Sequence, residues 1–242
     1  MLCMEKNNTS GVAGFFYQFR CLIITARPRH WCKNLLLYLA FIFSIGQHST
    51  QSVVGELSLF GQVTIGVLLF SLLTGATYIV NDLWDIQQDR AHPIKRQRPL
   101  ASGRLTPATA VVGAALMAVA GVAMAFLLGT FFGTIAVIYF AVSLGYTFYF
   151  KKITILDVFA ISGGFVLRAA AGAVVIEAPI SPWLYLMTSL GALFLALGKR
   201  RNELTVLGEK GKTHRVALSG YSTVLVDQLV GVVAPAMVVA YT

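Results

Sequence analysis

The sequence has few charged residues for its length, and this scarcity excludes a soluble domain. Of its 242 residues, 12% are charged and 57% are hydrophobic, and the mean hydropathy is +0.73. Soluble domains carry about 25% charged residues. The apolar runs also lack the alternation of apolar and polar residues that marks a transmembrane β-barrel. We therefore predict an all-α, polytopic membrane protein built as a helical bundle.

Cysteine is also scarce. Its spacing fits neither a disulfide framework nor a metal site; the three positions are Cys3, Cys21 and Cys32. The N-terminus lacks the apolar core and cleavage site of a signal peptide. Aromatic and aliphatic residues mix with polar ones over residues 12–26, which predicts a helix lying in the membrane interface. We expect residues 1–33 to form a cytoplasmic or interfacial segment, followed by a transmembrane domain over residues 34–242.

Apolar runs of membrane-spanning length recur along the chain. We predict seven, at residues 34–48, 58–80, 107–129, 131–150, 155–176, 182–198 and 218–241. Of the 19 Lys and Arg residues, all but Arg168 lie before the first run or in every second loop after it. Such residues concentrate in cytoplasmic loops, so the N-terminus is predicted to be cytoplasmic, in the cell membrane. The net charge of +9 therefore reflects topology and not nucleic-acid binding.

An acidic cluster follows the second apolar run. On a helix of about 100° per residue, four side chains share an arc of roughly 100°: Asn81, Asp82, Asp85 and Asp89. Carboxylates at a helix C-terminus are disfavoured by the helix dipole, which indicates a binding function more than a solvated helix end. A metal that is bound by carboxylate oxygens next to a substrate phosphate is usually Mg²⁺. We predict that Asp82, Asp85 and Asp89 bind this metal and that Asn81 acts with them in catalysis.

A basic loop comes directly after the acidic cluster. Pro93 and Pro99 interrupt the helix, so the loop's side chains can turn back over the carboxylates, although some of them serve only as a positive-inside anchor. We predict Arg90, Lys95 and Arg98 as substrate-binding residues.

Further substrate-binding residues are predicted at the cytoplasmic ends of other spans. Lys33 and Asn34 open the first span, a favourable position for an anion, although an interfacial anchor fits Lys33 equally well. Lys199 and Arg200 follow the sixth span, where they form either a second phosphate clamp or a basic stop.

Arg168 lies within a predicted span. It follows Asp157 by eleven residues on nearly the same helix face and lies about 16 Å deeper. An arginine at that depth costs at least about 2.5–3.5 kcal/mol. It must therefore face a polar cavity, which we favour, or pair with an acidic partner such as Asp157 or Asp227. Both Asp157 and Arg168 are counted as substrate-binding residues.

Four segments together resemble the UbiA superfamily of membrane prenyltransferases, and most closely its phosphoribosyl-transferring branch. They are residues 27–34, 81–99, 165–172 and 198–203. The resemblance implies Mg²⁺-dependent transfer of 5-phosphoribose from phosphoribosyl diphosphate to a decaprenyl-type polyprenyl phosphate, for cell-envelope arabinan synthesis. It also implies nine spans, so a chain with about seven is expected to be incomplete at its C-terminus. A homo-oligomer is compatible with these features.

The expected mechanism is departure of a metal-bound diphosphate and attack by the lipid phosphate. That phosphate is already ionised, so no general base is needed, and the sequence shows no convincing histidine dyad. We expect the two phosphate ends of the donor to be oriented by Lys33, Lys95, Arg98 and Lys199.

One departure from the family pattern favours this branch. Most family members carry a second Asp-x-x-x-Asp motif, but here Ile161 follows Asp157 at the fourth position. The main alternative is prenyl transfer from a prenyl diphosphate to an aromatic acceptor. A small transporter or channel is a third possibility, suggested by the charges within predicted spans.

Overall fold

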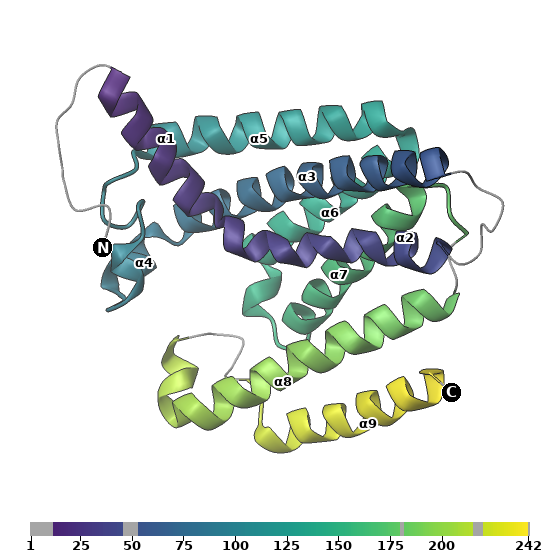
Figure 1. Ribbon diagram of the computed structural model, residues 1–242. Helices are drawn as coiled ribbons and strands as arrows, with labels where there is room; N and C mark the ends of the chain where they lie inside the picture. The colour runs from purple at the N-terminus through teal and green to yellow at the C-terminus, as the bar shows by residue number, and fades with distance from the viewer. Residues whose placement is uncertain (1–11, 46–52, 180–181, 215–219, 242) are drawn as a thin grey trace.

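The structure is a computed structural model that describes residues 12–45, 53–179, 182–214 and 220–241. Within these ranges the chain is helical and contains no strand (Figure 1). The elements are α1 Val12–Ala26, the 3₁₀ helix η1 Pro28–Leu37, α2 Tyr38–Ser44, α3 Val53–Trp84, α4 Ile86–Ala91, the 3₁₀ helix η2 Lys95–Gln97, α5 Pro107–Leu128, α6 Thr130–Phe148, the 3₁₀ helix η3 Phe150–Lys152, α7 Leu156–Val175, α8 Pro182–His214 and α9 Thr223–Tyr241.

Five described helices are long and apolar enough to cross a membrane. They cover Gly55–Trp84, Pro107–Leu128, Thr130–Lys152, Leu156–Val175 and Thr223–Ala240. Each coincides with a predicted span, which confirms the all-α, multi-pass membrane architecture. The tight connection between the third and fourth spans is also present, since only Gly129 separates α5 from α6.

The other two predicted spans differ from expectation. The first comprises the end of η1 and the seven-residue helix α2, and its last residues, 46–48, lie outside the described ranges. The sixth forms the first part of α8, which continues to His214. Lys199 and Arg200, which were expected to follow the span at its cytoplasmic end, therefore lie inside a helix that runs on to His214. The charge-rich stretch contains good helix formers and no proline, so it prolongs the helix.

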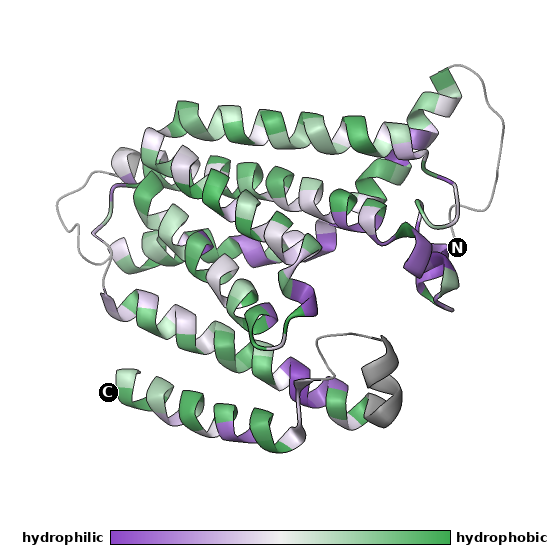
Figure 2. Cartoon of the chain, turned by 180° about the vertical axis from the view of Figure 1, so that it is seen from behind, coloured by the Kyte–Doolittle hydropathy of each residue, from purple (hydrophilic) through white to green (hydrophobic). Residues whose placement is uncertain are grey.

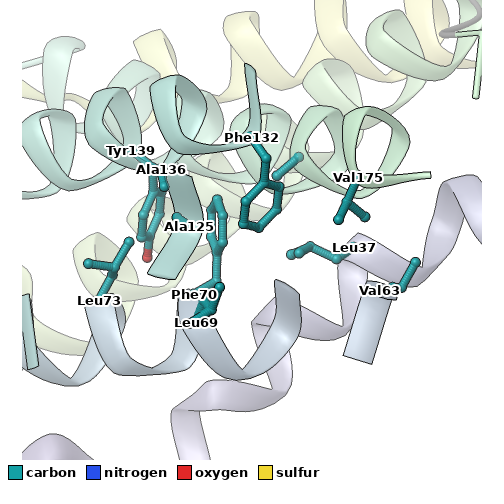
Figure 3. Packing of buried hydrophobic residues seen from close by; sticks show 11 residues of the cluster. Leu37, Val63, Leu69, Phe70, Leu73, Ala125, Phe132, Ala136, Tyr139 and Val175 are labelled. Atoms are coloured by element: carbon teal, nitrogen blue, oxygen red, sulfur yellow. The ribbon is translucent and has the colours of Figure 1, made fainter. Parts of the chain in front are cut away.

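The core of the bundle forms where η1, α3, α6 and α7 meet. The Phe70 ring lies 4.9 Å from the Tyr139 ring and 5.6 Å from the Phe132 ring, and Leu37 packs into the same cluster (Figure 3). Because lipid tails are as apolar as these side chains, the helices are held together by close packing and not by the hydrophobic effect. The core thereby fixes η1 against the spanning helices.

Gly172 allows η1 to cross α7 at very short range. A Cβ atom at this position would lie 2.0 Å from the carbonyl oxygen of Leu37, which is far inside van der Waals contact. The crossing therefore needs a glycine. It brings Asn34 of η1 beside Arg168 of α7, so this packing detail also positions polar groups.

Hydrophilic residues gather toward one end of the bundle, as Figure 2 shows. This end holds α4 and the ends of α3 and α6, together with the charged part of α8. The polar functional groups are therefore concentrated at one side, as the loop charges predicted.

Candidate active site

The acidic residues lie at the junction of α3 and α4. The predicted single helix is broken at Asp85, whose backbone has φ −92° and ψ 9°. Helix-type hydrogen bonds continue across the break, from the Asp85 amide to Asn81 at 3.0 Å and from the Asp89 amide to Asp85 at 2.8 Å. The junction therefore keeps the carboxylates near one another but divides them into two groups.

Asp82 and Asp89 form the first group and share one arginine. Nη1 of Arg98 lies 3.2 Å from Oδ1 of Asp82 and 2.6 Å from Oδ2 of Asp89. Nη2 of Arg27 donates to the same Asp82 oxygen at 2.5 Å. Both aspartates are buried, at 2% and 3% exposure. A buried carboxylate can stay ionised when a cation pairs with it. Here the basic loop supplies one of those cations, as predicted for Arg98.

Asp85 belongs to a second group, which includes a residue that the sequence had not indicated. Nζ of Lys151 lies 2.7 Å from both carboxylate oxygens of Asp85 and 3.2 Å from Oδ1 of Asn81. Lys151 belongs to η3, so this pair joins the end of α3 to the end of α6. The sequence had suggested only a topological role for Lys151, because nothing local connects two residues 66 positions apart.

A basic pocket of about 330 Å³ opens beside Asp82. Its lining includes four cationic side chains, Arg27, Lys95, Arg98 and Arg104. Such a set suits a phosphate or diphosphate. The predicted substrate contact Arg90 is not part of this lining. Its Nε donates to the carbonyl of Ala101 at 3.2 Å and so holds the loop.

The carboxylates fit a divalent cation as a pair and not as a trio. In the part of the chain that the structure describes, no three His, Cys, Asp or Glu side chains gather closely enough to hold a metal ion. Oxygens of Asp82 and Asp89 nevertheless converge on one cationic nitrogen of Arg98. Mg²⁺ binds through one or two carboxylates together with water and phosphate, so these two oxygens suit it.

Arg168 lies deeper in the bundle, among neutral polar groups. Its exposure is 7%. Nε donates to Oδ1 of Asn34 at 2.8 Å, Nη2 to the Tyr139 hydroxyl at 2.6 Å and Nη1 to the carbonyl of Gly164 at 2.9 Å. The Asn34 amide in turn donates to Ser71 at 3.0 Å. Two residues predicted as substrate contacts, Asn34 and Arg168, are thus brought together.

The alternative that Arg168 pairs with Asp157 or Asp227 is wrong, because both carboxylates are engaged elsewhere. Asp157 lies 3.2 Å from Nε of Arg200, and both side chains are fully buried. The Tyr221 hydroxyl donates to Asp157 at 2.7 Å, and burial together with this hydrogen bond raises the pKa of Tyr221. Asp227 pairs with Arg201 at 2.5 Å. The long helix α8 supplies both of these arginines, and its extension had not been predicted.

The charges of Arg168 and Lys199 act on Lys33. Lys33 keeps an exposed surface, and its pKa is lowered first by partial desolvation of its ammonium group and then by the charges of Arg168 and Lys199. The pKa of His30 is lowered in the same way, by burial and by Lys33, Arg27 and Lys199. The predicted substrate contacts Lys33, Arg168 and Lys199 therefore form one electropositive region.

These features define a polytopic membrane protein with an ionised cluster at one end of its helical bundle. The sequence pattern of the UbiA prenyltransferase family matches residues 34–202, and the chain belongs to this family. It is therefore a membrane-bound transferase.

Relatives in several bacteria share much of the sequence. The chain is 35% identical to decaprenyl-phosphate phosphoribosyltransferase of Mycolicibacterium smegmatis, over 91% of this chain and 68% of that protein. It is 33% identical to the protein of the same name from Mycobacterium tuberculosis, over 89% of this chain and 70% of that protein. Nodulation protein NoeC of Azorhizobium caulinodans is 31% identical, over 76% of this chain and 58% of that protein.

Solved structures confirm the fold. A UbiA homologue from Archaeoglobus fulgidus, bound to GPP and Mg²⁺, superposes with a TM-score of 0.70 at 18% identity, over 91% of this chain and 75% of that one. A digeranylgeranylglyceryl phosphate synthase superposes with a TM-score of 0.67 at 16% identity, over 95% and 76%.

Proposed function

We propose that the protein transfers 5-phosphoribose from phosphoribosyl diphosphate to a decaprenyl-type polyprenyl phosphate and releases diphosphate. The observation that carries this proposal is the basic pocket beside the buried pair Asp82 and Asp89, lined by Arg27, Lys95 and Arg98. The printed names of the relatives from Mycolicibacterium and Mycobacterium support the same activity.

The residues around the pocket divide the work of binding a diphosphate. Arg27, Lys95 and Arg98 would donate to its oxygens and hold the donor in one orientation, which lowers the entropic part of the barrier. Asp82 and Asp89 would hold Mg²⁺, which offsets negative charge on the departing diphosphate. Asp85 would keep the junction of α3 and α4 in place through Lys151.

Transfer breaks one bond and forms another at the anomeric carbon. The C1–O bond to the diphosphate breaks with its electron pair, and an oxygen of the lipid phosphate forms the new C1–O bond from the opposite side. The second pKa of a phosphate monoester is about 6, so this oxygen is already ionised near neutral pH. No side chain has to remove a proton.

The surroundings of Asp157 disfavour aromatic prenyl transfer. A second metal site would require Asp157 to be available, but its carboxylate is fully buried against Arg200 and also accepts from Tyr221. The metal would accordingly be held at the α3–α4 junction.

The orientation in the membrane follows from the distribution of charge. The segments that follow α3 and α6, and the later part of α8, carry the basic clusters, which favour the cytoplasm. We infer that the protein lies in the cell membrane, with its N-terminus and active site facing the cytoplasm, where a soluble donor is available.

The decisive experiment supplies the purified chain with competing labelled donors. With Mg²⁺ and a polyprenyl phosphate, label from phosphoribosyl diphosphate is expected in the lipid fraction. Label from a prenyl diphosphate is not expected to reach an aromatic acceptor such as 4-hydroxybenzoate. The reverse pattern would contradict the proposal and support aromatic prenyl transfer.

A further inference from the structure

The basic pocket of the candidate site depends on one loop, residues 98–106, which we call the pocket loop. It supplies two of the four cationic side chains that line the pocket, Arg98 and Arg104. The loop turns back on itself near Gly103, whose φ is +76°, and the Ser102 amide donates to the carbonyl of Arg98 at 2.9 Å. The position of the pocket loop therefore decides where the Arg98 guanidinium lies.

A glutamine far away in the sequence connects this loop to α1. Nε2 of Gln18 donates to the carbonyl of Arg104 at 2.9 Å, and Oε1 of Gln18 accepts from the Thr106 amide at 3.1 Å. One side-chain amide thus satisfies both a carbonyl and an N–H group of the same loop. Gln18 is half-buried and neutral, so neither contact with lipid nor the placement of positive charge accounts for it.

Apolar packing also holds the pocket loop against α1. Cys21 and Ala26 of α1 share one buried cluster with Leu100 and Leu105 of the loop. The hydrophobic effect is non-directional, so this packing keeps the loop on the bundle without fixing its position along α1. Hydrogen bonds weaken steeply when their geometry is distorted. The two bonds of Gln18 therefore fix that position.

Both α1 and the pocket loop contribute to the lining of the basic pocket. Ile24 and Thr25 of α1 line it, and Arg27, which follows α1, donates to Oδ1 of Asp82 at 2.5 Å. Arg98 of the loop lies 3.2 Å from the same oxygen. The spacing of the Arg27 and Arg98 guanidinium groups therefore depends on how α1 and the loop are held together.

We propose that Gln18 is a positioning residue for the diphosphate donor, because it fixes the pocket loop on α1 and with it the spacing of Arg27 and Arg98. This assignment rests on the proposed function. Gln18 is not part of the pocket lining, so it acts through the two arginines. Their donors must match the oxygens of one diphosphate, and a displacement of about 1 Å in such a contact can cost about 100-fold in rate.

The pocket loop should stay folded without Gln18. Its two leucines remain buried, and Arg104 closes the loop by donating to the Ser102 hydroxyl at 2.9 Å and to the carbonyl of Gln97. Loss of the Gln18 amide therefore lets the loop shift without unfolding it. The effect should appear in the affinity for the donor more than in the stability of the protein.

The test measures binding of inorganic diphosphate, with Mg²⁺ present, to the full chain in nanodiscs. Gln18→Leu removes both hydrogen bonds with little change in size, and it should weaken binding by roughly tenfold. Gln18→Asn keeps the amide but is one methylene too short to reach both backbone groups, and it should weaken binding by at least about threefold. The matched control is Gln228→Leu, the same change at an exposed position of α9, which should alter the affinity by less than about twofold.

Turnover separates a positioning role from a structural one. In Gln18→Leu the KM for phosphoribosyl diphosphate should rise by about tenfold, whereas the KM for the polyprenyl phosphate should stay within about twofold of its original value. A residue that only stabilised the fold would lower the unfolding temperature and the amount of active protein, and it would leave the donor KM unchanged.

Unchanged diphosphate affinity in the Gln18 variants would overturn the assignment, and so would an equal rise of both KM values or a lower unfolding temperature with an unchanged donor KM. Gln18→Asn keeps a polar side chain, so it provides the test even if Gln18→Leu fails to fold. The two proposals can fail separately. Diphosphate binding that depends on Gln18, in a chain that transfers no phosphoribose, would contradict the proposed function alone. Phosphoribosyl transfer with a donor KM that does not depend on Gln18 would contradict this assignment alone.

Discussion

At the scale of single residues, the site depends on how buried carboxylates are compensated. Asp82 accepts from Arg27 and Arg98 and is nearly inaccessible. If it also holds the metal, Asp82→Asn removes charge where the leaving group must be stabilised. We expect turnover to fall by at least about 100-fold, the scale seen when one electrostatic contact to developing charge is lost. Initial rates with purified protein at saturating Mg²⁺ measure this effect.

The control for Asp82→Asn is Glu56→Gln, which removes a carboxylate from the first turn of the same helix. It lies at the other end of α3 and should leave the rate unchanged. Equal losses of turnover in both variants would mean that the rate depends on the total charge of α3 and not on the carboxylate at position 82. Size-exclusion profiles of the two variants show whether each remains folded.

The lowered pKa of Lys33 gives a second prediction at this scale. Desolvation of its ammonium group and the charges of Arg168 and Lys199 favour its neutral form, so Lys33 loses its proton at a lower pH than an ordinary lysine. As pH rises through that lowered pKa, the positive charge that is expected to orient the donor disappears, and the KM for phosphoribosyl diphosphate should increase. Lys33→Arg keeps its charge over this range because the guanidinium pKa exceeds about 12.

The measurement is the KM for phosphoribosyl diphosphate from about pH 7 to about pH 10. The alkaline rise should move to higher pH in Lys33→Arg, while the KM for the lipid acceptor stays constant in both proteins. An identical alkaline limb in the two proteins would exclude Lys33 as the titrating group.

Sequence reasoning found many of these residues but few of their partners. Arg98 follows the acidic cluster closely, so the proline-containing loop indicated that it could turn back over the carboxylates. Lys151 lies 66 residues from Asp85, and Arg27 lies 55 residues from Asp82. Such pairings are set by helix packing, which no local pattern reports. Arg27 was not among the predicted site residues, although it lies in a segment that resembles the family.

At the scale of helices, Gly172 sets the distance between α7 and η1. In Gly172→Ala, the new Cβ would overlap backbone atoms of Leu37, which cannot rotate away as a side chain can. The helices must separate, and the hydrogen bond from Arg168 to Asn34 lengthens with them. We expect destabilisation of about 1–3 kcal/mol, as for other overpacked sites, measured by thermal unfolding in detergent.

Gly163 in the same helix is a matched control, because a Cβ there would meet no atom within 4 Å. Gly163→Ala should be neutral or stabilise the protein by up to about 1 kcal/mol through helix propensity. If the two variants unfolded at the same temperature, close approach at Gly172 would not be limiting.

Asp157 and Arg200 connect α7 to α8, and Tyr221 connects the same aspartate to the segment before α9. Asp157→Leu leaves the buried Arg200 with Glu203 as its remaining acidic partner, so it should destabilise the protein by about 1–3 kcal/mol, the cost of an unsatisfied buried group. The double variant Asp157→Leu with Arg200→Met removes both charges and should recover most of that loss. Unfolding of all four proteins in the cycle measures the coupling, and additive losses would contradict a mutual pair.

Element boundaries were predictable where apolar length decides them. The apolar runs that form α5, α6 and α7 are long and are bounded by glycine or charged residues, so these helices could be predicted. The structure confirms them. The 3₁₀ helix η1 was not predicted, because the packing of Leu37 on Gly172 favours its geometry and local propensity does not. The extension of α8 was missed because a basic stretch was taken to mark the end of a span, although Lys and Arg favour helix.

At the scale of the whole molecule, the chain separates an apolar body from one polar end (Figure 2). The acidic cluster and the basic pocket both lie where helices meet at this end. A soluble donor can then reach the active site from water, and a membrane-embedded acceptor can reach the same site from the lipid. This explains why the polar clusters occupy every second connection along the sequence and why the hairpin at Gly129 has only one connecting residue.

The orientation of this polar end can be tested by labelling. In a chain whose three cysteines are replaced by alanine, Gln88→Cys places a thiol on α4 and Thr130→Cys places one at the α5–α6 hairpin; both positions are exposed. A membrane-impermeant maleimide should label Thr130→Cys in intact cells and Gln88→Cys only in inverted vesicles, because basic loops are retained in the cytoplasm. The opposite pattern would place the active site outside the cell, where a cytoplasmic sugar diphosphate could not reach it.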